Sequence, residues 1–374
     1  MKKIFTLVFM IGLSLIAKAQ LTDGFYHVKN TYTNRYIYMN DDSKGTTSVA
    51  TGPDASAVRS SRNKEFMFTH PGAVVLITSK GGGLYDVAAQ GTSFGQLTGG
   101  RLYPQLERQP DGTYRFHGSY EGMDYTFGDL SRDREDGWML EVIKGTKNSF
   151  WQLLPIDNKA DGEFLGLKPD VQTADGSWWG TIYTGFPFSL ESEGMVAYYV
   201  DKVSSSEFKL KELGGKGTKV AGYTPVVIKC ASEDYAKNIV RPLTSSVSEL
   251  TDNKLKGVFF DSSYKSHVKR TTYDKKTMRV IGVNANKELV FKTAGEEDLT
   301  DGAYLRHNKA YLEVSSGSAE TIVIEGGTGI HSIQVNTEVE TTKEGTYNLA
   351  GQRTEDNPTA PGVYIKDGKK VIVR

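Results

Sequence analysis

Three stretches in the first part of the chain repeat one pattern, and this repetition constrains the fold more than any other feature. They read GFYHVKNTYTNRYIYMNDD from Gly24, GAVVLITSKGGGLYDVAAQ from Gly72 and GTYRFHGSYEGMDYTFGDL from Gly112. Each contains a glycine, a short run of strand-forming residues, a polar or glycine-rich turn and a second such run, which is the pattern of a β-hairpin. Threefold repetition of such a unit predicts a threefold β-barrel.

Each hairpin is followed by a further segment that we interpret as strand-like. These segments are EFMFTHPG, GRLYPQLERQPDG and SFWQLLPIDNKADG. Two fragments, LYDV at Leu84–Val87 and FWQLLP at Phe150–Pro155, resemble the repeats of ricin-type lectins, which have the β-trefoil fold. The resemblance covers about residues 21 to 157 and implies a β-trefoil there. The LYDV match also implies a sugar-binding aspartate at Asp86.

The second run of each hairpin ends in an acid or amide beside an aromatic residue. A carboxylate or amide can hydrogen-bond a pair of sugar hydroxyls, and an aromatic ring can stack under the sugar. The candidate carbohydrate-binding residues are therefore Asn40, Asp41, Asp86, Asp129, Tyr38, Tyr85 and Phe127. The alternative is that the acids only form turns, which Asp and Asn favour for local reasons.

From about residue 162 to 325 the sequence pattern changes to short strand-forming runs separated by Asn, Asp and Gly, which indicates a β-sandwich module. Two portions of this module look related. Each has two strand-like runs, a loop and a closing apolar run: AYYV, FKLKEL and YTPVVIK in the first, and RVIGV, ELVFKT and NKAYLEV in the second. The NKAYLEV stretch at Asn308–Val314 and the TPV strand resemble surface proteins exported by Bacteroidales (Bacteroidetes) bacteria. This resemblance implies an extracellular module.

The stretch GSWWGTIYTGFPF from Gly176 is the most aromatic part of the chain. Trp178 and Trp179 could form a platform for sugar rings. Alternation along a strand instead places Trp178 and Ile182 on one side and Trp179 on the other, as in a sandwich core. Both interpretations stay open from the sequence, and the core is the favoured one.

The two ends of the chain suggest export. Residues 1–19 combine two lysines, an apolar stretch and Ala17-Lys18-Ala19, which is the layout of a signal peptide. Residues 326–345 are polar and predict a linker. Residues 346–374 end in GVYIKDGKKVIVR, which predicts a hairpin around Asp367-Gly368, with Val363, Ile365, Val371 and Val373 on one face. This ending resembles a short form of the sorting domain read by the type IX secretion machinery, which implies that machinery as a partner.

Charge and motifs exclude several functions. Lys+Arg and Asp+Glu number 45 each, which leaves no basic footprint for nucleic acid. After signal cleavage no transmembrane segment is expected. The six histidines lack metal-ligand spacing, no catalytic motif is recognised, and no cofactor or metal is predicted. The single Cys230 lies in an apolar run and is interpreted as a buried residue.

These observations predict an all-β protein: a β-trefoil, a β-sandwich module and a short C-terminal β-hairpin tail. The location is extracellular or at the outer-membrane surface, with the periplasm as the alternative. We expect a non-catalytic binding protein that recognises a glycan or host surface through the trefoil. A structural or adhesion protein without a sugar site is the second hypothesis, and a polysaccharide-active hydrolase is the third.

Overall fold

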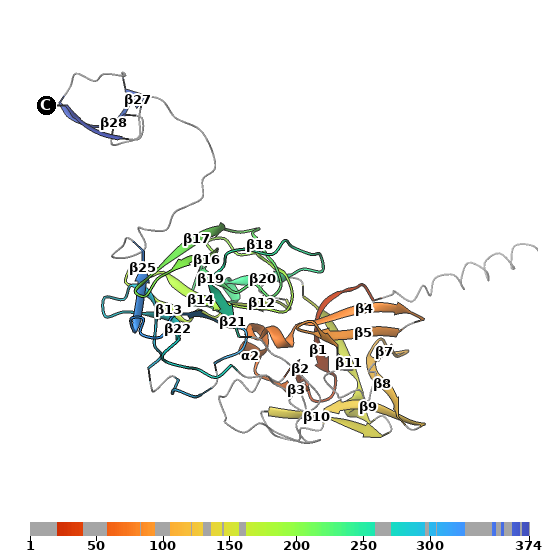
Figure 1. The fold of residues 1–374 in the computed structure, drawn as a ribbon. Coiled ribbons are helices and arrows are strands. Elements are labelled where there is room, and N and C mark those ends of the chain that lie inside the picture. The colour runs from red at the N-terminus through yellow and green to blue at the C-terminus, as the bar shows by residue number, and fades with distance from the viewer. Residues whose placement is uncertain are drawn as a thin grey trace, which may run out of the picture. The chain divides into compact units, whose positions relative to one another are not determined.

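In the computed structural model, nearly all of the described secondary structure is β-strand, which confirms the predicted all-β class (Figure 1). It describes residues 21–39, 58–82, 84–93, 105–120, 122–129, 136–143, 146–156, 162–258, 271–295, 299–303, 305–325, 346–348, 353–354, 361–366 and 369–373. The chain divides into two units, Met1–Gln334 and Val335–Arg374. No helix within the described ranges has the length and apolar character needed to cross a membrane. The predicted signal peptide and linker lie outside these ranges.

The first part of unit one is a single sheet of eleven described strands. These are β1 (Gly24–Asn30), β2 (Tyr36–Met39), β3 (Val58–Ser61), β4 (Val75–Gly81), β5 (Leu84–Ala89), β6 (Thr92–Ser93), β7 (Gln105–Arg108), β8 (Tyr114–Tyr120), β9 (Met123–Asp129), β10 (Asp136–Ile143) and β11 (Trp151–Pro155), with the 3₁₀ helix η2 (Lys147–Ser149) before β11. The main path runs β11-β1-β2-β3-β10-β9-β8-β7-β5-β4, with β6 paired to β5. Further pairings of β1 with β4 and of β11 with β8 curl this sheet back on itself.

The three hairpins predicted from the repeats are all present. β1 pairs with β2, β4 with β5 and β8 with β9, each antiparallel. The glycine-rich turn of the second hairpin places Gly81 and Gly82 at φ +84° and +64°, which side chains other than glycine rarely adopt. The threefold arrangement of a β-trefoil stays a prediction.

One of the predicted strands is wrong. The EFMFTHPG segment forms the helix α2 (Lys64–Thr69) and the 3₁₀ helix η1 (Pro71–Ala73). Asn63 caps the helix, because its side chain accepts a hydrogen bond from the Phe66 N–H at 3.1 Å. The apolar run looks like a strand, but this cap and a proline at the start of the next turn favour two helical turns.

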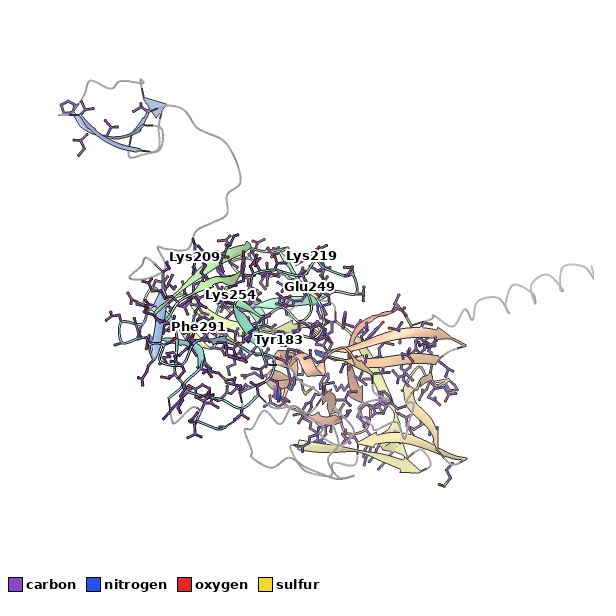
Figure 2. All side chains as sticks on the ribbon, viewed as in Figure 1. Tyr183, Lys209, Lys219, Glu249, Lys254 and Phe291 are labelled. Atoms are coloured by element: carbon purple, nitrogen blue, oxygen red, sulfur yellow. The ribbon has the colours of Figure 1, made fainter. Side chains whose placement is uncertain are left out.

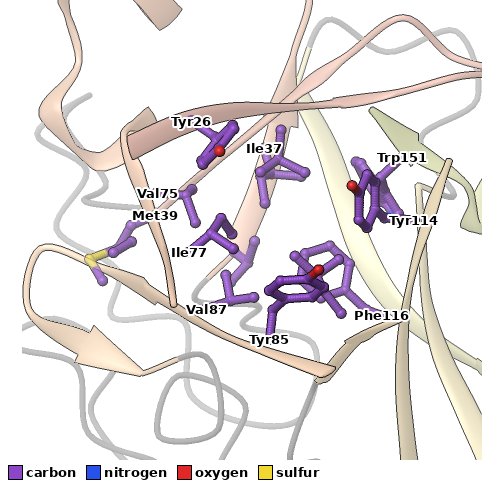
Figure 3. Close-up of a cluster of buried hydrophobic side chains, with 14 residues drawn as sticks. Tyr26, Ile37, Met39, Val75, Ile77, Tyr85, Val87, Tyr114, Phe116 and Trp151 are labelled. Atoms are coloured by element: carbon purple, nitrogen blue, oxygen red, sulfur yellow. The ribbon is translucent and has the colours of Figure 1, made fainter. Parts of the chain in front are cut away.

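The interior of the first sheet is a continuous apolar cluster (Figure 3). Trp151 and Phe116 are fully buried there, with ring centroids 5.8 Å apart and nearly perpendicular. Phe116 comes from the third hairpin, and Ile37 and Ile77 bring the first and second hairpins into the same cluster. The repeated hairpins therefore share one core.

The second part of unit one contains two sheets and a 3₁₀ helix, η3 (Tyr235–Lys237). The smaller sheet has the order β12 (Leu165–Gly166), β20 (Ile239–Pro242), β15 (Phe188–Leu190) and β18 (Lys219–Val220). The larger has the order β13 (Val171–Gln172), β14 (Trp178–Ile182), β19 (Val226–Cys230), β16 (Val196–Val203), β17 (Glu207–Gly214), β25 (Thr321–Ile324), β23 (Leu289–Lys292), β22 (Met278–Val283), β24 (Ala310–Glu313) and β21 (Leu255–Gly257).

The order of the larger sheet shows an internal duplication. β14-β19-β16-β17 lies on one side of β25, and β21-β24-β22-β23 lies on the other in the mirrored order. In each half a hairpin (β16–β17 or β22–β23) pairs through its first strand with a later strand (β19 or β24). Tyr223 and Asn308 precede those later strands and have φ of +59° and +60°. The two portions that look related in the sequence therefore have the same topology.

The two faces of β14 bury different apolar clusters. Ile182 and the half-buried Trp178 pack in a cluster that draws on both sheets. Trp179 is fully buried in a second cluster with Phe291, which is labelled in Figure 2. The predicted alternation of this strand is therefore confirmed.

The first sheet packs against the second part of unit one through aromatic and polar contacts. His27 on β1 is fully buried, and its Nδ1 lies 2.8 Å from the Glu163 carboxylate. Phe68 on α2 packs against Phe164, with ring centroids 4.9 Å apart. The Gly185 N–H donates to the side chain of Gln90 at 2.7 Å. The two parts consequently form one unit.

The C-terminal unit is a sheet of four described strands. Its order is β27 (Arg353–Thr354), β26 (Thr346–Asn348), β28 (Gly362–Lys366) and β29 (Lys369–Val373). The predicted hairpin is confirmed, but the predicted apolar face is wrong. The register pairs Val363 with Ile372 and Tyr364 with Val371, so Val363 and Val371 lie on opposite faces. The pairing of Lys366 with Lys369 sets this register and decides which residues of β29 share a face with Val363.

Candidate functional site

The hairpin acids occupy contrasting environments. Asp86 is exposed at the surface, and its carboxylate lies 2.7 Å from the Lys80 ammonium across the same hairpin. Asp129 is fully buried, where its carboxylate accepts a hydrogen bond from the Thr33 hydroxyl. The Asn148 side chain donates to the Asp129 carbonyl at 2.9 Å. Asp129 thus joins the turn after β1 to the end of β9.

The aromatic residues predicted beside these acids lie mostly in the core. Tyr85 is buried in the first cluster, and its hydroxyl accepts from the Leu21 N–H at 3.1 Å. Tyr38 is buried against Phe66, with ring centroids 5.0 Å apart. Asn40, Asp41 and the side chain of Phe127 lie outside the described residues. Among the described contacts, none joins Asp86 to Asp129.

The predicted aromatic platform is divided between two clusters. Trp179 is fully buried, and Trp178 is half-buried on the opposite face of β14. The two indoles therefore cannot present one continuous stacking surface on this strand.

A cavity of about 360 Å³ lies where the first sheet meets the second part of the unit. We call it the junction cavity. Three segments that are distant in the sequence surround it: 66–71 from α2 and η1, 166–170 after β12, and 306–309 before β24, with Thr181 and Ile182 of β14 between them. Its volume falls within the range of small-ligand sites.

The first wall of the junction cavity is formed by α2 and η1. Phe66 and His70 line the cavity, with their rings 4.9 Å apart and nearly perpendicular. The His70 Nδ1 accepts a hydrogen bond from the Gly72 N–H at 2.8 Å, which orients the imidazole. Tyr38 packs behind both rings. Tyr38, one of the predicted binding residues, therefore supports this wall of the cavity from behind.

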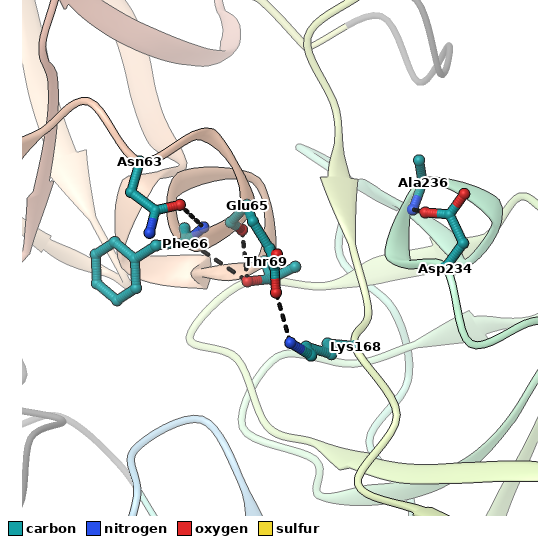
Figure 4. Close-up of polar contacts among 7 residues, drawn as sticks. All are labelled: Asn63, Glu65, Phe66, Thr69, Lys168, Asp234 and Ala236. Atoms are coloured by element: carbon teal, nitrogen blue, oxygen red, sulfur yellow. Dashed lines mark hydrogen bonds and ion pairs between the residues drawn. The ribbon is translucent and has the colours of Figure 1, made fainter.

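The second wall is the segment that follows β12. Lys168 reaches across to α2, where its ammonium lies 2.5 Å from the Glu65 carboxylate (Figure 4). Gly166 permits a close approach, because a Cβ at this position would lie 2.5 Å from the Tyr235 carbonyl oxygen. The segment is thus fixed on both sides.

Asp170 anchors the third wall. One of its carboxylate oxygens lies 2.7 Å from the Lys309 ammonium, and the other accepts the Thr181 N–H at 2.9 Å. Asn308, in the left-handed conformation, donates its amide to the Tyr183 carbonyl at 2.8 Å. These contacts hold the 306–309 segment against β14.

The charge of the junction cavity is predominantly positive. Lys168, Lys309 and Arg306 line it, and Asp170 is the acidic residue among its described lining. Arg306 is exposed, and no ion pair or hydrogen bond engages its guanidinium within the described part of the chain. Both Asp170 oxygens are already engaged. An incoming anion would therefore meet an available guanidinium.

A second cavity of about 310 Å³ adjoins the first. The two share Asp170, Thr181, Arg306 and Lys309 in their linings. The rest of the second lining is largely aliphatic, from β22 and the segments around Leu299 and Leu305. Burial, with a smaller contribution from Glu313, raises the pKa of Tyr311, whose side chain also lines this cavity. We call this cavity the apolar cavity.

The junction cavity was not predicted from the sequence. NKAYLEV marks one of its segments, but only as a strand. His70 and His307 line it, although the spacing of the histidines in the sequence gives no sign that these two meet. Within the described residues, no three His, Cys, Asp or Glu side chains gather as a metal site. Because the residues of this cavity come from three distant segments, no local sequence motif predicts that they lie together.

No protein-family model, no curated protein and no solved structure matches this chain.

Proposed function

We propose that this chain is an exported binding protein that recognises an acidic glycan through the junction cavity. The observation that carries the proposal is the Arg306 guanidinium, which no described residue engages, in a ligand-sized cavity that Lys168 and Lys309 also line. A guanidinium binds a carboxylate or sulfate through two parallel hydrogen bonds. Phe66 adds an aromatic side chain to the first wall of the same cavity.

Binding is better supported than hydrolysis. A glycosidase generally uses two carboxyl groups about 5 to 9 Å apart. In the junction cavity Asp170 is the carboxylate that the described lining provides, and its oxygens are held by Lys309 and the Thr181 N–H. Such a carboxylate is suited to fixing a loop rather than to exchanging protons.

The test is a comparison of acidic and neutral oligosaccharides on a glycan array, followed by calorimetry with an acidic oligosaccharide. We expect the acidic ones to bind and Arg306→Gln to weaken binding about tenfold, the loss of one charge-assisted contact. Lys219→Gln is the matched control, because Lys219 is an exposed cation on β18 that does not line the cavity. Equal binding of neutral sugars would contradict the proposal.

The same experiment tests the earlier hypotheses. Binding that is insensitive to Arg306→Gln but lost in Asp86→Ala would place the sugar at the hairpins. Release of shorter products would indicate the hydrolase. No binding at all would favour the structural or adhesion role.

A further inference from the structure

The apolar cavity and the proposed glycan site have four lining residues in common. Asp170 and Lys309, whose charged atoms lie 2.7 Å apart, line both cavities, as do Thr181 and Arg306. The Ala310 N–H donates to the Thr181 hydroxyl at 3.1 Å, which fixes the shared wall. A ligand bound at Arg306 therefore has the apolar cavity beside it.

The walls of the apolar cavity are suited to an uncharged group. Val258 and Leu305 are buried, and Val280 and Leu299 pack against the same small cluster. All four line the cavity, and Tyr311 adds a neutral ring. The described lining also contains the cations Lys292, Arg306 and Lys309, of which Lys309 is paired with Asp170. A ligand that joins an apolar group to an anion matches both the aliphatic residues and the cations of this lining.

We infer that the ligand is an acidic sugar bearing an apolar aglycone, with the sugar carboxylate at Arg306 and the aglycone in the apolar cavity. This inference rests on the proposed function and adds the class of substituent that the sugar carries. Burial of the aglycone contributes affinity in proportion to the apolar area removed from water.

Two probes separate the contributions. Methyl β-D-glucuronide presents the anionic sugar alone, and p-nitrophenyl β-D-glucuronide adds an apolar ring. We expect calorimetry to give about tenfold tighter binding for the second probe, since its ring leaves water. Ala294→Phe should abolish this gain by filling the apolar cavity, of which the half-buried Ala294 is a lining residue. Binding of methyl β-D-glucuronide should stay unchanged in this variant.

Val283→Ser provides a second variant if Ala294→Phe does not fold. Val283 lines the apolar cavity and is half-buried, so the change removes apolar contact without adding volume. It should reduce the gain of the nitrophenyl probe and leave the methyl probe unaffected. If both glucuronides bind equally, or if the gain survives in both variants, the inference is overturned while the proposed function stands. If neither glucuronide binds, both fall.

Discussion

Both parts of unit one bury polar residues that join segments, such as Asn238 in the second part, but the cations that line the junction cavity come from the second part. In the first sheet, His27, Asn30 and Asp129 are fully buried and hold neighbouring segments together. In the second part, Lys168, Arg306 and Lys309 lie along a cavity. Repetition in a sequence therefore reports the geometry of hairpins, whereas a site arises where loops from different parts of the chain meet.

The largest effect should come from the tryptophan that each part buries. Trp151 and Trp179 are both fully buried, in different clusters. Replacing either with alanine should lower the free energy of unfolding by about 3 to 5 kcal/mol, because the change removes a large ring and leaves a cavity. Urea denaturation measures this loss.

Trp178→Ala is the matched control, since Trp178 neighbours Trp179 in the sequence but is only half-buried. Its loss should be clearly smaller. If Trp178→Ala costs as much as Trp179→Ala, the assignment of the two faces of β14 is wrong.

Replacement of the hairpin acids should have an intermediate effect on the free energy of unfolding, and the effect should be larger for the buried acid than for the exposed one. Asp129→Ala leaves the Thr33 hydroxyl without its acceptor inside the protein, which should cost about 1 to 3 kcal/mol of unfolding free energy. Asp86→Ala removes only a surface ion pair with Lys80 and should change stability by less than about 0.5 kcal/mol. Thermal or urea melts compare the two. Equal losses would mean that the hairpin acids share one role.

Local patterns predict most of this fold. The three hairpins, the duplicated module and the C-terminal hairpin follow from alternation and turn residues, which act over a few positions. Helix α2 does not, because the cap at Asn63 outweighs an apolar run that resembles a strand. The face of the last hairpin depends on turn length, where an error of one residue exchanges the faces.

The junction cavity could not be predicted from local sequence patterns, for a different reason. It requires His70, Lys168 and Arg306 to meet, and their segments come together only through packing of the two parts. The net charge does not predict that these residues lie together, since the chain as a whole is neutral. The repeats do not predict it either. A site of this kind becomes visible only once the tertiary contacts are known.

The smallest effect is expected at Cys230, the buried cysteine of β19. Burial, with a smaller contribution from Asp170, raises the pKa of this thiol from 9.0 to about 12, although Lys309 opposes the shift. The reactive thiolate is therefore scarce at pH 8, and the native protein should show no alkylation by iodoacetamide in mass spectra. Because the folded pKa lies above the unfolded one, the stability from the neutral thiol is present below about pH 8.5 and is lost as the pH rises toward 12.

The reactivity of Cys230 also reports whether the two parts of unit one unfold together. Cys230 belongs to the cluster shared by both sheets of the second part, whereas Trp151 belongs to the first sheet. In the Trp151→Ala protein, the urea concentration at which Cys230 becomes reactive should fall together with the unfolding of the first sheet, because contacts such as His27 with Glu163 and Phe68 with Phe164 couple the parts. If Cys230 keeps its original protection while the first sheet unfolds, the parts are separable. Rapid alkylation of the native protein would instead contradict the buried position of the thiol.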